Sequence, residues 1–193
     1  MSAVIMALRS ATQDAHGALD ASLDPEALLA TREGYARFLA ALYGFHVAVE
    51  EELGELTLPG LADAPARTSL LAADLTVLGA DPEAIPVMEH LAAVTDDGAR
   101  HGLLYVVEGS ALGGTVLGRI VQRTLGYGPD HGAAFFGAGA ATPGRWRQVK
   151  DLLEREAGGP RLAPAQRAAA DAFAALARWM QTSGVARTDA VAE

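Results

Sequence analysis

The chain has 193 residues, 50% of them apolar, and a formal net charge of −9. Its length suits one domain with a sizeable core, and its charge argues against nucleic acid and anionic membranes as partners. Since it contains no cysteine, disulfides, thiolate nucleophiles and thiolate metal sites are excluded.

The sequence also gives no sign of membrane insertion or export. No uninterrupted apolar run reaches the ~18–20 residues that span a bilayer. The opening residues lack the basic region and the long apolar stretch of a signal peptide. We therefore expect a cytoplasmic protein.

Apolar residues at intervals of three, four and seven dominate the first half of the chain. This spacing predicts four helices, at about residues 1–23, 31–56, 66–78 and 87–94. Thr31 is the expected N-cap of the second helix, and Asp24-Pro25 is expected to end the first.

Glycine and proline divide the second half into shorter pieces. We expect a glycine-rich helix at 101–119, a short apolar piece at 132–136, a loop at 137–144, and helices at 146–157 and 164–181. Residues 183–193 are expected to be a frayed tail. Because no segment alternates with period two, the prediction is an all-α, single-domain fold of seven or eight helices over residues 1–182.

The glycine-rich helix is unusual for this alanine-rich chain. Its glycines are Gly102, Gly109, Gly113, Gly114 and Gly118. Each glycine inside a helix costs roughly 1 kcal/mol relative to alanine. Something must therefore lie so close to this backbone that a Cβ would collide with it. Two kinds of neighbour fit, namely another helix or a flat ligand, and the helix alone does not decide between them.

Among five histidines, none has the spacing of a helical metal site, and no nucleophile elbow, phosphate loop or dinucleotide fingerprint is present. His16 stands out by its neighbours on one helix face. Arg9 lies two turns before it and Asp20 one turn after it. If His16 held a porphyrin iron, Arg9 would be placed to reach the propionates, and Asp20 could orient the imidazole.

Two stretches together resemble the heme oxygenase family. They are LRSATQDAH, which ends at His16, and YVVEGSALGG, which spans Tyr105–Gly114. The resemblance continues through the GAAFF segment and Trp146-Arg147, and it is closest to the bacterial branch that includes bacteriophytochrome-associated enzymes. It implies a heme oxygenase-like multi-helical fold in which heme lies between a proximal helix and a kinked distal helix.

The resemblance also implies residue roles. His16 becomes the proximal iron ligand, and the distal helix exposes backbone that organises water for proton delivery. The distal residues are Gly109, Ser110, Gly113 and Gly114. Cofactor contacts are expected from Arg9, Asp20, Phe135, Phe136, Arg147 and Lys150. The animal branch has an aspartate where Ser110 stands, and a hydroxyl is a weaker organiser of water than a carboxylate.

The function implied is oxidation of heme by O2 to biliverdin, CO and ferrous iron. Because the chain has no flavin or nicotinamide motif, electrons would come from a separate reductase or ferredoxin, and a bacteriophytochrome is a candidate recipient of biliverdin. The alternative is a non-catalytic heme sensor or carrier of the same fold. A thiamin-degrading enzyme of related fold is disfavoured, because its chemistry uses a cysteine nucleophile that this chain lacks.

Overall fold

The computed structural model describes residues 3–54, 66–89, 91, 94, 96–141 and 144–186. Within these ranges the chain is helical, and its only β-type pairings are isolated bridges around Gly128. The elements are α1 (Ala3–Ser22), α2 (Pro25–Leu28), α3 (Arg32–Leu53), α4 (Arg67–Val77), the 3-10 turn η1 (Pro82–Ala84), α5 (Asp97–Leu125), α6 (Ala134–Ala141), α7 (Arg145–Glu156), the 3-10 turn η2 (Gly159–Arg161) and α8 (Leu162–Thr182). The predicted all-α class is confirmed.

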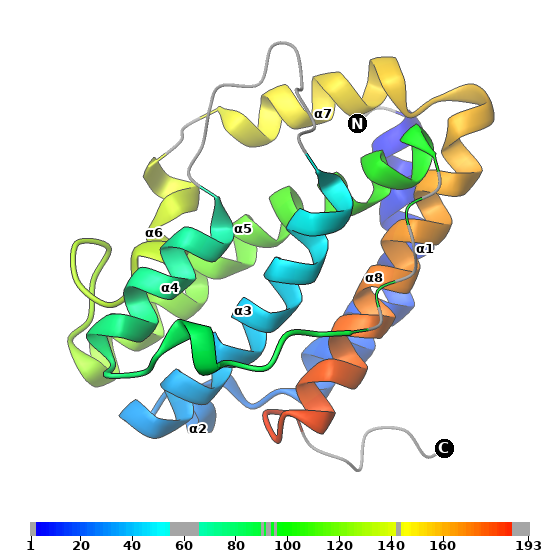
Figure 1. Ribbon diagram of the computed structural model, residues 1–193. Coiled ribbons are helices and arrows are strands. Elements are labelled where there is room, and N and C mark those ends of the chain that lie inside the picture. The colour runs from blue at the N-terminus through cyan, green and yellow to red at the C-terminus, as the bar shows by residue number, and fades with distance from the viewer. Residues whose placement is uncertain are drawn as a thin grey trace.

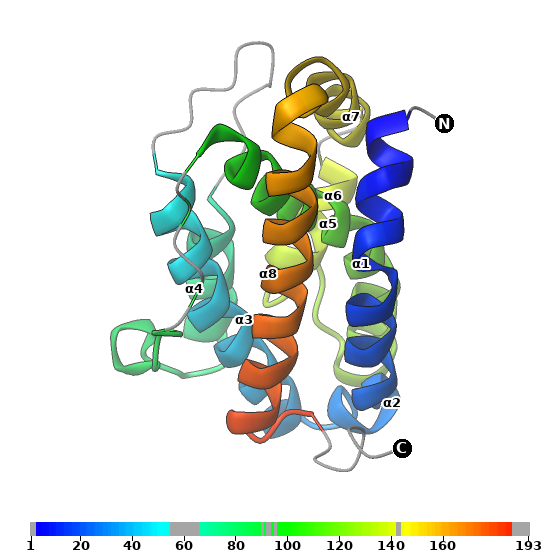
Figure 2. The same cartoon turned by 90° about the vertical axis from the view of Figure 1, so that its right-hand side faces the viewer.

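Helix α8 is the common support of the fold (Figures 1 and 2). It packs along α1 on one side and along α5 on another, whereas α1 and α5 do not pack extensively on each other. Helix α3 packs against α4 and α5, and α6 lies between α4 and α5. Helix α7 contacts both α5 and α1 at the end of the molecule that holds the N-terminus.

Two glycines make the crossing of α5 and α8 very close. An added Cβ at Gly102 would overlap the backbone carbonyl of Ala165, and one at Gly98 would lie 2.6 Å from the carbonyl oxygen of Arg161. These two glycines therefore serve a helix crossing, which is one of the two explanations that the sequence left open. Helix α5 bends further along, at residue 112.

Helix α5 is also the one described helix that is long and apolar enough to cross a membrane by length and composition. Its best window has a mean hydropathy of 1.2 and is 41% buried inside the molecule. One such helix is weak evidence for a membrane span, because core helices of globular proteins pass the same test.

Asp24-Pro25 follows the end of α1 at Ser22, as predicted, and it also begins a short helix that the sequence did not predict. These residues begin α2, because Asp24 accepts the Ala27 N–H at 3.1 Å and Pro25 occupies the first helical position, where its missing N–H is harmless. Thr31 is confirmed as the N-cap of α3, since its hydroxyl oxygen accepts the Gly34 N–H at 3.1 Å.

Two other predictions are wrong. The expected helix at 87–94 is not helical at its described positions, where Asp81-Pro82 opens only the short turn η1. The expected loop at 137–144 is helical as far as Ala141. Asp74, a residue of α4, accepts the N–H groups of Ala134 and Phe135 at 2.8 and 2.9 Å and so caps the start of α6 from outside the helix.

The glycine-rich helix is longer than predicted at both ends. Asp96 caps its start, and Gly126 ends it in the left-handed conformation. The second helix, α3, ends at Leu53, earlier than the expected residue 56, and Gly54 caps it with a φ of 59°. The predicted tail from residue 187 onward lies outside the described ranges. The domain bounds of 1–182 and 183–193 stay predictions.

Substitution of glycine by alanine at two positions of α5 should have opposite effects. Gly102→Ala is expected to lower stability by about 2 kcal/mol through overpacking on α8, which corresponds to roughly 4–8 °C in Tm. Gly113→Ala should be neutral or stabilising by up to ~1 kcal/mol, because an added Cβ there meets nothing within 4 Å. Thermal unfolding followed by circular dichroism measures both, and equal effects would contradict the packing argument.

Candidate functional site

His16 is an accessible imidazole with one nitrogen already engaged. Its side chain is 54% exposed, and its Nδ1 lies 3.5 Å from Oδ2 of Asp20 one turn later. The ring meets Phe173 of α8 edge to face, with centroids 5.0 Å apart. A carboxylate beside Nδ1 favours a proton on that nitrogen, so Nε2 is left with a lone pair for a ligand.

The face of α1 around His16 is open along its length. Exposed residues recur along it at helical spacing, and they are Arg9, Gln13, His16, Gly17 and Asp20. No described side chain forms an ion pair with Arg9. The structure therefore presents Arg9, His16 and Asp20 on one accessible face, as the helical spacing predicted.

The glycines of the predicted distal segment have different surroundings. An added Cβ at Gly109 would lie 3.4 Å from the ring of Trp146, and one at Gly114 would lie 3.4 Å from the ring of Phe136. Both distances are ordinary van der Waals contacts, so neither ring requires a glycine at these positions. Gly113 is exposed, with nothing within 4 Å of an added Cβ.

The hydroxyl of Ser110 is committed to its own helix. Its Oγ donates to the carbonyl oxygen of Val107 at 2.8 Å, while the residue itself is exposed. A serine bonded back in this way has its proton engaged but keeps lone pairs that can accept from water. Ser110 can therefore hold a water molecule as an acceptor, which is a smaller role than a carboxylate would have.

Phe135 and Phe136 occupy different environments. Phe136 is buried, with its ring 6.2 Å from that of Tyr35 and 6.4 Å from that of Phe38, and it lies against the glycines of α5. Phe135 is half-buried and meets the ring of His46 edge to face at 5.3 Å. Phe136 is thus a core residue that packs against the buried side of the distal helix.

The two basic residues predicted on α7 are accessible. Arg147 is exposed and Lys150 is half-buried, and neither has an ion-pair partner in the part of the chain that the structure describes. Like Arg9, they are cations left available on an acidic protein. No contact joins them to His16 or to one another.

A buried ionic cluster beside the distal segment escaped the sequence analysis. Glu108, whose side chain is 8% exposed, accepts two hydrogen bonds from Arg145, at 2.9 Å from Nε and 2.7 Å from Nη2. Arg67 Nη2 lies 3.4 Å from the same carboxylate. These residues come from α5, α7 and α4, and no local sequence pattern links positions so far apart.

His46 is a second buried polar residue near the distal helix. Burial lowers the pKa of His46 to about 3, and the charge of Arg67 adds to this effect. Its ring is enclosed by Phe45 and Phe135, and its Nδ1 finds no hydrogen-bond partner among the described residues. At neutral pH the imidazole is therefore uncharged.

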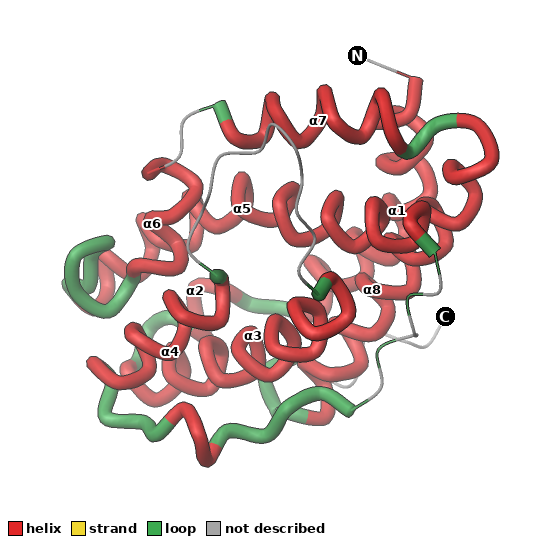
Figure 3. Tube along the Cα trace, turned by 45° about the horizontal axis from the view of Figure 1, so that its top comes forward, coloured by secondary structure: helices red, strands yellow, loops and turns green. Residues whose placement is uncertain are grey.

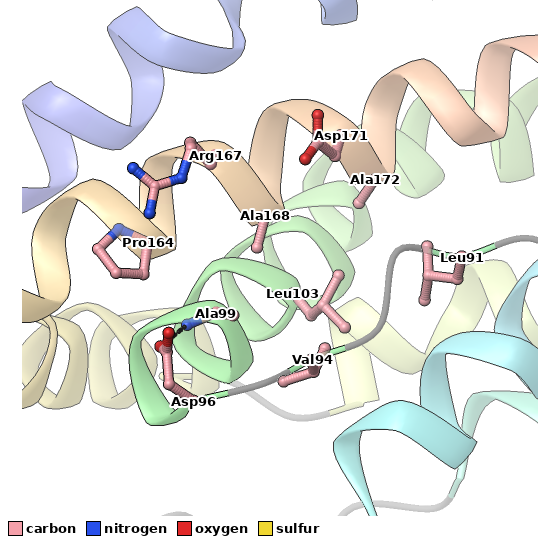
Figure 4. Close-up of a pocket in the computed structure, with 10 residues that line it drawn as sticks. All are labelled: Leu91, Val94, Asp96, Ala99, Leu103, Pro164, Arg167, Ala168, Asp171 and Ala172. Atoms are coloured by element: carbon pink, nitrogen blue, oxygen red, sulfur yellow. Dashed lines mark hydrogen bonds between the residues drawn. The ribbon is translucent and has the colours of Figure 1, made fainter.

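The structure also has a pocket that the predicted site residues do not form (Figure 4). It has a volume of about 130 Å³ and lies between α8, the start of α5 and Leu91 and Val94. Ligand sites usually measure ~300–1,000 Å³, so this pocket is too small for a porphyrin. None of the predicted site residues lines it.

The residues around His16 suit an iron whose other ligands are supplied by a cofactor rather than by the protein. Within the described ranges, no three acidic or histidine side chains gather closely enough to hold a bare metal ion. A porphyrin supplies four nitrogen ligands and leaves an axial position for a single imidazole. Its carboxylates would need local cations, which the exposed arginines and lysine offer.

Comparison with known proteins decides the family. The family model described as heme oxygenase matches residues 2–182. The chain belongs to the heme oxygenase family. The predicted fold, enzyme class and activity are thereby confirmed, and heme binding is the property that this family implies.

Bacterial heme oxygenases are among its relatives. A heme oxygenase of Xanthomonas campestris pv. campestris is 33% identical over 125 residues, which are 63% of this chain and 72% of that protein. The NO- and CO-bound heme oxygenase of Neisseria meningitidis superposes with a TM-score of 0.74 at 25% identity, covering 98% of this chain and 95% of the other. The heme oxygenase of Leptospira interrogans shares the fold, with a TM-score of 0.64 at 20% identity over 92% and 100% of the two chains.

The burial of His46 predicts a specific pH dependence of stability. A pKa near 3 in the folded state, against about 6.5 unfolded, means that His46 contributes stability above pH ~6.5 that is lost as pH falls toward 3. The slope from this one group reaches up to ~1.4 kcal/mol per pH unit. Urea unfolding midpoints between pH 7 and pH 4 measure it in this heme oxygenase without ligand.

The variant His46→Gln should have a visibly shallower slope over this range. Some slope should remain, because burial also lowers the pKa of His101. His131→Gln is the matched control, since His131 is exposed. An unchanged slope in His46→Gln would show that His46 does not titrate in this window.

Proposed function

We propose that this heme oxygenase holds heme between α1 and α5, with His16 as the axial iron ligand, and oxidises it to biliverdin, CO and ferrous iron. The observation that carries the proposal is the accessible imidazole of His16 with a carboxylate beside its Nδ1. Bound heme supplies the iron at which O2 is activated and is itself the molecule oxidised. The remaining roles belong to side chains and backbone of the chain.

Asp20 is the orienting group in this proposal. A carboxylate near Nδ1 keeps the proton on that nitrogen and makes Nε2 a better ligand. Phe173, packed edge-on against the ring, limits its rotation. Together they present one nitrogen in one direction, which a ligand on an exposed helix face needs.

Gly113 provides the open position on the distal side. With no side chain and no neighbour there, small molecules and water have access to the heme face. Ser110, whose oxygen can accept a hydrogen bond, and the nearby backbone are proposed to position the water that delivers protons. Gly109 faces the ring of Trp146, and Gly114 faces the ring of Phe136.

Arg9, Arg147 and Lys150 are proposed to hold the heme propionates. The chain has a net charge of −9, so an anionic ligand needs local cations to bind. Helix α7, which carries two of these cations, packs against the helix that carries the third. We propose that Phe135, which is half-buried, contributes an apolar wall, with Phe136 behind it.

The electron donor is proposed to be a separate reductase or ferredoxin, and the location to be cytoplasmic. We also propose that the biliverdin is passed to a bacteriophytochrome. This proposal is supported by the resemblance of the two sequence motifs to the bacterial branch that includes bacteriophytochrome-associated enzymes. In the alternative function, a non-catalytic heme carrier, His16 would also bind the heme iron, but the heme would not be oxidised.

Replacement of His16 tests the ligand. His16→Ala is expected to abolish the axial-imidazole spectrum of the ferric heme complex and its turnover, because His16 is the one histidine of α1. Absorption spectroscopy, followed by product analysis after a single turnover with reductant and O2, measures both. In the unchanged protein the Soret band should be lost as biliverdin absorption rises.

His131→Ala is the control, because it removes an exposed imidazole away from α1 and should change neither property. An intact axial spectrum in His16→Ala would assign the iron to another histidine. Stable heme with no biliverdin from the unchanged protein would favour the carrier.

A size series at Gly113 tests the distal side. Gly113→Ala should be tolerated, whereas Gly113→Leu should weaken heme binding by roughly tenfold to a hundredfold through ~1–3 kcal/mol of overpacking against the bound ligand. Both variants should fold, because nothing lies within 4 Å of an added Cβ in the protein itself. Heme titration measures the effect, and full affinity in Gly113→Leu would place the ligand elsewhere.

A further inference from the structure

Helix α7 connects the two helices that the proposed function places on either side of heme. In Figure 3 it runs across the molecule from the side of α6 and α5 toward the start of α1. It packs against α5 and against α1, which do not pack extensively on each other. Its buried face is apolar, through Val149, Leu152 and Leu153.

At its first turn, α7 is attached to α5 by two adjacent contacts. The guanidinium of Arg145 forms a two-pronged pair with Glu108, and the ring of the next residue, Trp146, lies against Gly109. Neighbouring residues of one helix thus meet neighbouring residues of the other. The attachment falls at the residue where the distal glycine segment begins.

This attachment is costly to break. Glu108 and Arg145 have side chains only 8% and 15% exposed, and Arg67 reaches the same carboxylate. Removing one partner of a buried ion pair typically costs several kcal/mol, because the other charge is left unpaired in a poorly hydrated place. Because the guanidinium of Arg145 is planar and bonds both oxygens of Glu108, it fixes the relative orientation of the two side chains as well as their distance.

Near its last turn, α7 is attached to the start of α1. Oε1 of Glu154 accepts the N–H of Ile5 at 3.0 Å. That N–H belongs to the first turn of α1, whose amides have no partner within the helix, so Glu154 caps α1 from a distance. Just beyond α7, Gly158 lies near the side chain of Val4.

We propose that α7 is a crossbar that sets, together with α8, the separation between α1 and α5, with Glu108 and Glu154 as positioning residues at its two ends. Neither residue needs to touch the ligand to act. The inference rests on the proposed function only where it concerns heme. The spacing itself is a property of the protein without ligand.

The consequence concerns how heme fits. A porphyrin is rigid and has a fixed thickness, so a loosened crossbar should let it tilt or turn without changing the iron ligand. Variants at Glu108 should therefore keep the axial-imidazole spectrum. They should release heme about tenfold faster, which corresponds to ~1.4 kcal/mol. They should also alter the proportions of biliverdin isomers.

The direct test measures the separation of α1 and α5 in the protein without heme. The chain has no cysteine, so Asp14→Cys on α1 and Gln122→Cys on α5, both at exposed positions, give a unique pair of spin-label sites. Pulsed electron paramagnetic resonance then reports the distribution of distances between them. Glu108→Gln and Glu154→Ala should each broaden and shift this distribution.

Asp74→Asn is the matched control. It also alters a buried carboxylate that accepts two hydrogen bonds, but those bonds cap α6 and do not involve α7. It should lower Tm while leaving the distance distribution unchanged. Arg145→Lys, which keeps the charge and loses the fork, replaces Glu108→Gln if the latter does not fold.

The outcomes separate the two proposals. An unchanged distribution in the Glu108 and Glu154 variants, or an equal change in Asp74→Asn, overturns the crossbar whatever heme does. A changed distribution supports the crossbar even if His16 proves not to be the ligand. Altered isomer proportions together with an intact axial spectrum support its role in the reaction, and unaltered proportions overturn that role.

Discussion

The close crossing of α5 over α8 is the constraint on which the rest of the molecule depends. At Gly98 and Gly102 the two backbones approach so nearly that a methyl group would not fit. This crossing anchors the first part of α5 and leaves its second part, after the bend, to extend beside α6. The same support, α8, carries α1 and places Phe173 against His16.

Charge burial is the second organising feature of this heme oxygenase. Glu108, Arg67 and Arg145 join three helices through one carboxylate, and Asp74 caps α6 from α4. Burial raises the pKa of Asp74 and lowers that of His46, so both depend on the packing around them. Of these groups, Glu108 directly precedes the distal segment and ties its start to Arg67 and Arg145.

Local patterns predicted the parts of the site that local geometry determines. Arg9, His16 and Asp20 lie on one face of α1 because helical spacing alone places them there, and Thr31 caps α3 through a contact three residues away. The glycines of α5 were harder to interpret, since their surroundings differ from one position to the next. Gly102 meets α8, Gly114 meets Phe136, and Gly113 meets nothing. The Glu108–Arg145 pair spans 37 positions, and its partners become neighbours only through packing of whole helices.

The distal glycines have a consequence for motion as well as for space. A helix poor in Cβ atoms has little intrinsic preference for its own conformation, so the segment from Gly109 to Gly114 is held mainly by what packs around it. Such a segment opens locally at a lower free energy than the anchored start of α5. A ligand resting against it would reduce that opening, and part of its binding energy would be spent on ordering the backbone. The affinity for such a ligand and the rigidity of the segment from Gly109 to Gly114 therefore both depend on the equilibrium between its closed and locally opened forms.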